Sequence, residues 1–211
     1  MLISRSKKFL FIHIQKTAGR SFEAVLKDNI PDLENFMGTH DHALWAREQI
    51  GDEWQDYYKV AFVRNPWDRL VSWYTMIKEK GTLTWQKRIF GKRRYNNLTQ
   101  YVLANSNSFE EFLYNCTDTI DDIDGKKSIL YNQLDYLTDE EGALIVDFVG
   151  RFEDLNGDSN KVFQNLGLDK VSLPHKNSSK HRDYRTYYTE ETREEVGRRY
   201  ARDIEFFGYE F

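Results

Sequence analysis

The sequence has little cysteine, little proline and no long apolar run. Cys116 is the single cysteine among 211 residues, so the chain has no partner for an internal disulfide, and no set of residues has the spacing of a zinc site. The first apolar run, 9–14, is too short for the core of a signal peptide or for a membrane span. These absences predict a soluble protein of the cytoplasm with no transmembrane segment.

The net charge of the chain is small and negative. The formal net charge is −4 at pH 7, which gives no reason to expect a nucleic-acid partner, and any anion site has to be a local feature. Apolar residues make up 40% of the chain and aromatic residues 15%, which is enough for a sizeable core. No repeat and no linker divides the sequence, so a single domain over residues 1–211 is expected.

Short apolar runs alternate with helical patterns along the chain. The strand-like runs are 9–14, 60–63 and 144–149, with a weaker one at 34–39. Helices are expected at 43–50, 67–80, 109–115, 159–166 and 190–204. This alternation predicts an α/β fold with an open sheet of parallel strands that has helices on both faces.

The stretch 82–107 interrupts this pattern because it is polar. It contains a basic cluster, made up of Lys87, Arg88, Lys92, Arg93 and Arg94. We interpret the stretch as an inserted loop, which either is simply solvated or serves as a lid or landing patch for an anionic acceptor.

The first apolar run ends in a polar loop that leads into a helix. The loop reads Lys16-Thr17-Ala18-Gly19-Arg20-Ser21, and Phe22, Val25 and Leu26 follow at helical spacing. Gly19 indicates a tight turn or a close approach of the backbone. A lysine, hydroxyl groups and the N–H groups of a helix start together form an anion site, most readily for phosphate, although an ordinary turn with a surface lysine has the same outline.

A second motif lies at the end of the run 60–63. Arg64 stands where that strand stops, Pro66 suits the first turn of the next helix, and Ser72 follows about two turns along it. An arginine at this place suits phosphate because its fork of N–H donors is bidentate. With the Lys16 loop, it predicts two anion sites at the carboxyl ends of neighbouring strands, where open α/β sheets bind nucleotides.

Both motifs resemble those of a known enzyme family. HIQKTAGRSF (13–22) resembles the 5′-phosphosulfate-binding loop of sulfotransferases, and FVRNPWDRLVSWY (62–74) is similar to their 3′-phosphate-binding motif. The likeness is closest to the carbohydrate branch (heparan and chondroitin type), to which VGRFEDL (149–155) and LPHKNSS (173–179) are also similar. The sequence departs from the family at Gln15, usually proline, and at Arg20, usually threonine or serine.

The resemblance implies the sulfotransferase fold, a P-loop-like three-layer α/β/α arrangement with a central parallel sheet. It also implies an enzyme that uses 3′-phosphoadenosine 5′-phosphosulfate (PAPS) as co-substrate. The acceptor would be a hydroxyl, most readily on a carbohydrate or glycoconjugate, and no metal is implied. The family's members in animals are Golgi membrane proteins, and a chain without an anchor suggests a soluble bacterial member.

The resemblance also assigns roles to residues. Lys16 would contact the leaving phosphate, Thr17, Ala18, Gly19, Arg20 and Ser21 would hold the 5′ side, and Arg64, Ser72, Lys180 and Arg182 would hold the 3′-phosphate. The catalytic base would be a histidine before the second helix. Family spacing, counted back from Gly51, selects His40 and leaves His42 as the runner-up.

Several alternatives stay open at this point. One alternative has Asp41 as a helix cap between two bystander histidines, and another has His40 and His42 as a metal pair that lacks a third ligand. A P-loop-type nucleotide kinase is the rival enzyme, but its signature places the lysine after the glycines, whereas Lys16 precedes Gly19. A non-catalytic nucleotide-binding scaffold of the same fold is the third reading. Neither the acceptor nor the oligomeric state follows from the sequence.

Overall fold

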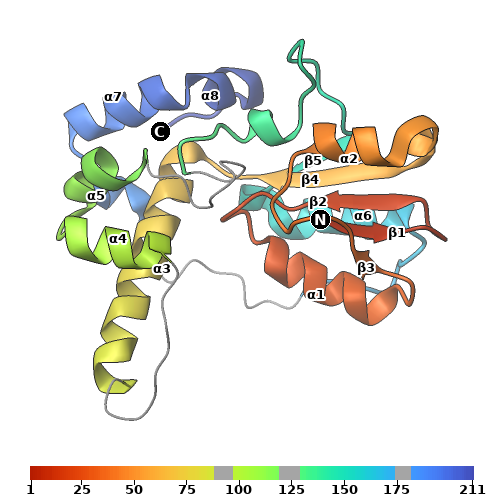
Figure 1. Ribbon diagram of the computed structural model, residues 1–211, viewed down its shortest axis with the longest axis horizontal. Coiled ribbons are helices and arrows are strands. Elements are labelled where there is room, and N and C mark those ends of the chain that lie inside the picture. Colours follow the sequence, from red (N-terminus) through yellow and green to blue (C-terminus); the bar gives the residue numbers. More distant parts are fainter. Residues whose placement is uncertain (88–96, 119–128, 174–181) are drawn as a thin grey trace. The chain divides into compact units, whose positions relative to one another are not determined.

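The computed structural model describes residues 1–87, 97–118, 129–173 and 182–211, with side chains throughout these ranges except at 82–87. The chain divides into two compact units. Residues 1–64 and 132–178 form the sheet unit, and residues 65–131 and 179–211 form the helical unit. In Figure 1 the sheet unit therefore combines the red to orange start of the chain with the teal to cyan segment.

The sheet unit is built on five strands in the order β3-β1-β2-β4-β5. Their bounds are Leu2–Ser4 (β1), Phe9–Ile12 (β2), Glu34–Asn35 (β3), Tyr58–Val63 (β4) and Phe148–Arg151 (β5). The strands β2, β4 and β5 are parallel, whereas β1 is antiparallel to both β2 and β3. The predicted α/β fold is confirmed, with the correction that the sheet is mixed and only its β2-β4-β5 part is parallel.

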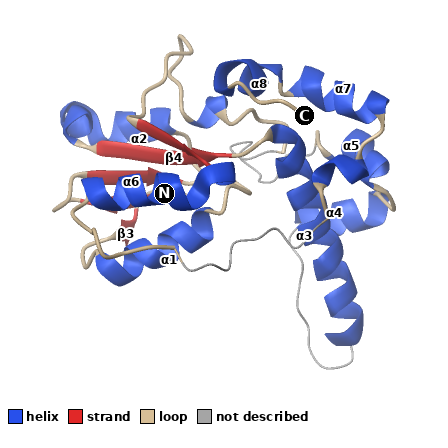
Figure 2. Cartoon of the chain, turned by 180° about the vertical axis from the view of Figure 1, so that it is seen from behind, coloured by secondary structure: helices blue, strands red, loops and turns tan. Residues whose placement is uncertain are grey.

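Helices cover both faces of this sheet. They are α1 (Gly19–Asn29), α2 (Ala43–Ile50) and α6 (Leu155–Asn165), with 3-10 turns η1 (Gly51–Asp56), η2 (Leu134–Tyr136) and η3 (Phe152–Asp154). Figures 1 and 2 show α1 and α2 on opposite sides of the strands. On the α1 side, the ring centroid of Phe22 lies 4.9 Å from that of Phe62 on β4 and 5.3 Å from that of Phe163 on α6.

The strands are buried on both sides, which explains their composition. Phe9 and Phe11 belong to the core cluster that α1 and α6 cover, and the alternate residues Leu10 and Ile12 are also fully buried. A strand that is covered on both faces reads as a continuous apolar run instead of an alternating one. Each phenylalanine buried in this way contributes about 1.5–3 kcal/mol to the hydrophobic stabilisation.

The helical unit holds the remaining helices. They are α3 (Pro66–Lys87), α4 (Asn97–Asn105), α5 (Phe109–Cys116), α7 (Glu190–Arg199) and α8 (Ala201–Phe207), with the 3-10 turn η4 (Tyr184–Tyr187). The side chain of Asn65 caps α3, since its Oδ1 accepts a hydrogen bond from the N–H of Trp67 at 3.1 Å. In the part of the chain that the structure describes, no helix is both long enough and apolar enough to cross a membrane.

Two predicted strands differ from the observed ones, and one strand was missed. The run 144–149 becomes a strand only at Phe148, and the weak run 34–39 is reduced to β3. Before Phe148, Leu144 forms an isolated bridge with Thr138, and Asp147 bonds to Lys59 through its main-chain N–H, at 3.0 Å, and through its carboxylate. The strand β1 has only three residues, too few for a periodic pattern to identify it.

The predicted helix bounds need four corrections, the first being that α6 begins at Leu155 and not at residue 159. Gly81 does not end α3, which continues to Lys87. A Cβ at position 81 would lie 2.8 Å from Cδ2 of Leu103, so the glycine permits close packing against α4. The predicted loop 82–107 is helical up to Lys87 and again in α4, while the basic cluster between them lies outside the described side chains. The C-terminal helix is interrupted at Tyr200, whose φ of −110° and ψ of 28° are not helical.

Candidate functional site

The loop between β2 and α1 has the backbone geometry of an anion site. Lys16 and Ala18 both adopt positive φ, 70° and 63°, and Ala18 is the N-cap of α1 without a side-chain capping bond. Left-handed residues in such loops turn successive N–H groups toward one side, as in anion-binding nests. The first turn of α1 contains no acidic residue, which leaves the positive end of the helix dipole favourable to an anion.

The hydroxyl of Thr17 supports this loop from inside. Thr17 is fully buried, and its Oγ1 donates a hydrogen bond to the carbonyl of Ile14 at 2.9 Å. Thr17 was expected on the 5′ side of the nucleotide, but its hydroxyl proton is used within the loop. Any contact of Thr17 with an anion would therefore come from its main-chain N–H.

Glycine is required at position 19 because the ring of His13 approaches the backbone there. A Cβ on Gly19 would lie 2.2 Å from Cδ2 and 2.3 Å from Nε2 of His13, distances at which one of the two residues has to move. The ring of His13 thus lies directly against the first residue of α1. Of the two readings that the sequence left open for Gly19, the close approach is confirmed.

Gly19→Ala is expected to destabilise the protein by about 1–3 kcal/mol, the usual cost of overpacking a filled site. It should also weaken nucleotide binding, since the displaced His13 ring would disturb the start of α1. Urea unfolding measures the first effect and calorimetry the second. Gly197→Ala in α7 is the matched control, because its Cβ would have only one neighbour, Trp67 Cζ2 at 3.6 Å, and a helical alanine is favoured over glycine. Equal stability of the two variants would contradict this account of Gly19.

Arg64 joins the second motif to the first. β4 runs parallel to and beside β2, so Arg64 and the Lys16 loop follow neighbouring strands at the same edge of the sheet. The Nη1 of Arg64 donates a hydrogen bond to the carbonyl of Lys16 at 3.3 Å. The predicted proximity of the two motifs at the carboxyl edge is confirmed.

Two residues that the sequence reading missed hold Arg64 in place. Gln133 is fully buried, and its amide accepts from the N–H of Arg64 and donates to its carbonyl, both at 2.8 Å. Phe152 lies under the guanidinium, whose central carbon is 3.8 Å from the ring centroid. Phe152 belongs to the family-like stretch 149–155, which was a usable signal, whereas nothing in the sequence pointed to Gln133.

His40 lies in the sheet unit beside the same loop. Its Nδ1 is 2.8 Å from the carbonyl oxygen of His13, and the two imidazole rings meet edge to face with centroids 4.6 Å apart. Since a carbonyl only accepts, Nδ1 of His40 carries the proton of this bond. In the neutral ring Nε2 then bears the lone pair, which is the form a general base needs.

His42 has different neighbours. It is the N-cap of α2, and its ring lies between those of Trp45 and Tyr136, with centroid distances of 4.3 and 4.5 Å. Asp41 does not cap α2 but accepts a hydrogen bond from the N–H of Gly38 at 2.7 Å. The reading of Asp41 as a helix cap is therefore wrong.

The metal-pair alternative gains no support. Among the residues that the structure describes, no group of three or more histidine, cysteine, aspartate or glutamate side chains is arranged to hold a metal ion. The rings of His40 and His42 also pack against different partners, His13 for the first and Trp45 with Tyr136 for the second.

The other predicted residues do not all belong to the sheet unit. Arg20 is exposed and Ser21 partly exposed in the first turn of α1. Ser72, on α3, and Arg182 belong to the helical unit, and Lys180 lies outside the described residues. The structure thus brings together Lys16, Gly19, His40 and Arg64, and it leaves the contribution of Ser72, Lys180 and Arg182 as a prediction.

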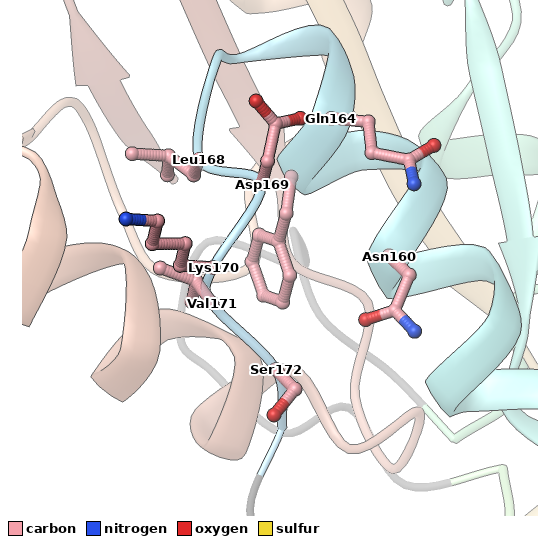
Figure 3. A pocket seen from close by; sticks show the side chains of 8 residues that line it. Asn160, Gln164, Leu168, Asp169, Lys170, Val171 and Ser172 are labelled. Atoms are coloured by element: carbon pink, nitrogen blue, oxygen red, sulfur yellow. The ribbon is translucent and has the colours of Figure 1, made fainter.

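A separate hollow of about 210 Å³ lies along α6 and the segment after it (Figure 3). Its lining consists of Asn160, Phe163, Gln164, Leu168, Asp169, Lys170, Val171 and Ser172. None of these belongs to the loop, to Arg64 or to His40. The hollow is thus lined by α6 and the residues after it, and by no residue of the candidate site.

Comparison with known proteins gives one match. A family model described as the sulfotransferase family matches residues 1–210, nearly the whole chain. Searches among curated proteins and among solved structures found no match.

Proposed function

The chain belongs to the sulfotransferase family, and from this we propose that it moves a sulfuryl group from PAPS to an acceptor hydroxyl on a carbohydrate or glycoconjugate. Sulfuryl transfer is the activity of the family. The donor and the acceptor are our proposal. The observation that carries it is the hydrogen bond from Arg64 to the carbonyl of Lys16, because it unites two anion-binding motifs in one place.

The proposed reaction suits the groups around the loop. In-line transfer requires negative charge to be stabilised on the group in flight and on the departing phosphate. In our proposal Lys16 contacts the bridging oxygen of the leaving phosphate, and the N–H groups at the start of α1 hold the 5′ side. The left-handed loop and the absence of an acid in the first turn of α1 support this assignment.

The proposed base is His40. It would take the proton of the acceptor hydroxyl on Nε2 while Nδ1 keeps its bond to the carbonyl of His13. His42 is the weaker candidate because its ring lies between two aromatic rings. The choice of a sugar as acceptor is supported by the resemblance of 13–22 and 62–74 to the carbohydrate branch.

The acceptor and donor are tested together by incubating the protein with labelled PAPS and oligosaccharides, glycolipids or small alcohols. The expected result is a labelled, sulfated oligosaccharide. A nucleotide-binding measurement separates the alternatives, since the sulfotransferase should bind 3′-phosphoadenosine 5′-phosphate (PAP) better than ADP or ATP. Preference for ATP with transfer of its terminal phosphate would favour a kinase, and binding of none of them would favour an inert scaffold.

Arg64→Ala is expected to weaken PAP binding by about 1.5–3 kcal/mol, the usual worth of a charge-assisted contact to the 3′-phosphate. 5′-AMP lacks that phosphate, so its binding free energy should weaken by at most about 1 kcal/mol. This loss would come from the missing hydrogen bond between Arg64 and the Lys16 carbonyl. Calorimetry with both nucleotides measures the difference. Equal losses for PAP and 5′-AMP would remove Arg64 from the 3′ side.

A further inference from the structure

His13, which is buried, and Glu23, which is partly exposed, form a pair that spans the Lys16 loop. His13 directly follows β2 and is 4% exposed, and its Nδ1 lies 2.7 Å from Oε1 of Glu23 on α1. One residue precedes the Lys16 loop and the other follows it. Their contact therefore connects the segment before the loop to the segment after it.

The direction of this hydrogen bond follows from the charge on Glu23. Burial on its own would raise the pKa of the Glu23 carboxyl, but the hydrogen bond from His13 and the positive charge nearby, including that of Lys27, lower that pKa from its ordinary value. Near neutral pH Glu23 is therefore a carboxylate, which only accepts. Nδ1 of His13 must carry the proton, and Nε2 lies on the ring edge that faces Gly19.

The same histidine holds the proposed base. The main-chain carbonyl of His13 accepts the Nδ1 hydrogen bond of His40, and the ring of His13 meets the ring of His40 at an interplanar angle of 71°. His13 thus contacts the loop through Gly19, α1 through Glu23 and the base through its carbonyl and ring. A shift of His13 would move all three.

We infer that His13 and Glu23 are positioning residues, which fix the tautomer of His40 and its place relative to the Lys16 loop. Neither needs to touch the nucleotide or the acceptor. The inference deepens the proposed function and rests on it for the role of His40 as a base. Displacing a reacting group by about 1 Å is known to cost up to about a hundredfold in rate, so positioning of this kind has a measurable effect.

The test compares Glu23→Met with Glu23→Gln. Methionine keeps the length of the side chain and removes the acceptor, whereas glutamine retains an oxygen that accepts from Nδ1 of His13. We expect Glu23→Met to lower kcat by about tenfold or more, and Glu23→Gln to stay within about threefold of the unchanged protein. Asp28→Asn, an exposed carboxylate further along α1, is the control for altering an acid on this helix.

A second readout does not depend on activity. Nitrogen-15 spectra of the histidine side chains, assigned with single His→Asn variants, report which ring nitrogen carries the proton in the nucleotide-free protein. We expect one tautomer of neutral His40, protonated at Nδ1, in the unchanged protein and in Glu23→Gln, and a mixture in Glu23→Met. If PAPS supports no transfer at all, the proposed function fails, and the spectra still decide whether the pair positions His40.

Three results would overturn the inference. They are an unchanged kcat with a single His40 tautomer in Glu23→Met, a Glu23→Gln variant as impaired as Glu23→Met, and a mixture of His40 tautomers in the unchanged protein. If Glu23→Met does not fold, the variants His13→Asn and His13→Gln test the inference in its place. Asparagine places an amide donor where Nδ1 was and glutamine where Nε2 was. Only His13→Asn should keep the His40 tautomer, and equal behaviour of the two variants would overturn the inference.

Discussion

Lys16→Met is expected to lower turnover by on the order of a hundredfold or more, while the protein stays folded. The methionine keeps most of the aliphatic stem and removes the ammonium that we place at the leaving phosphate. The loss corresponds to the removal of one oxyanion-type donor from the transition state. Single-turnover measurements with labelled PAPS and the acceptor found in the screen give the rate.

Methionine is the suitable replacement because of the backbone at this position. Lys16 has a φ of 70°, a left-handed conformation that costs a side-chain-bearing residue free energy and costs glycine none. The penalty is the same for lysine and methionine, so the variant isolates the charge. Lys170→Met, at an exposed lysine after α6, is the control and should turn over normally. Near-normal turnover of a folded Lys16→Met protein would reject the proposed role of Lys16.

His40→Ala is expected to have the largest effect, a loss of roughly a hundred- to ten-thousandfold in transfer rate, which is the ordinary contribution of a general base. Binding of PAP should be unchanged, because the histidine would contact the acceptor and not the nucleotide. In the unchanged protein the rate should fall at low pH, since protonation of Nε2 removes the lone pair that accepts the proton. A pH–rate profile and calorimetry test the two statements.

Two further variants separate the base from its neighbours. His40→Asn keeps an amide donor for the carbonyl of His13 but has no basic nitrogen, so it should be about as inactive as His40→Ala. His42→Ala should be much milder in rate, and its cost should be in stability, because the ring of His42 packs between Trp45 and Tyr136. An inactive His42→Ala with an active His40→Ala would exchange the two roles. Full activity of both alanine variants would make Asp41 the next candidate for the base.

The sequence predicted an element well where the residues of that element alone specify it. The helix α2 has the predicted bounds, 43–50, and the runs that became β2 and β4 were identified because strands covered on both faces are continuously apolar. The prediction of an anion site in the next loop came from Lys16 and Gly19 at the end of such a run. Its pairing with Arg64 followed from parallel strands, whose carboxyl ends meet at one edge of the sheet.

Elements that depend on distant partners were predicted poorly. The short strand β1 exists because it pairs with β2 and β3, and α3 passes Gly81 because Leu103 of α4 fills the space beside that glycine. At the break between α7 and α8, the side chain of Tyr200 is buried and its hydroxyl donates a hydrogen bond to the carbonyl of Ile129. In each case contacts far away in the sequence outweigh propensities of at most about 1 kcal/mol per residue.

The sequence by itself determined the family and the α/β class, and its two motifs predict where the anion sites lie, because these signals are carried by short runs of residues along the chain. Only the tertiary structure decided what those residues contact. His13, which reads as a core residue of a strand, meets Glu23, Gly19 and His40 because the loop folds α1 back over β2. A hydrogen bond depends on where two atoms lie in space to within a few tenths of an ångström, and spacing along the chain does not carry that information.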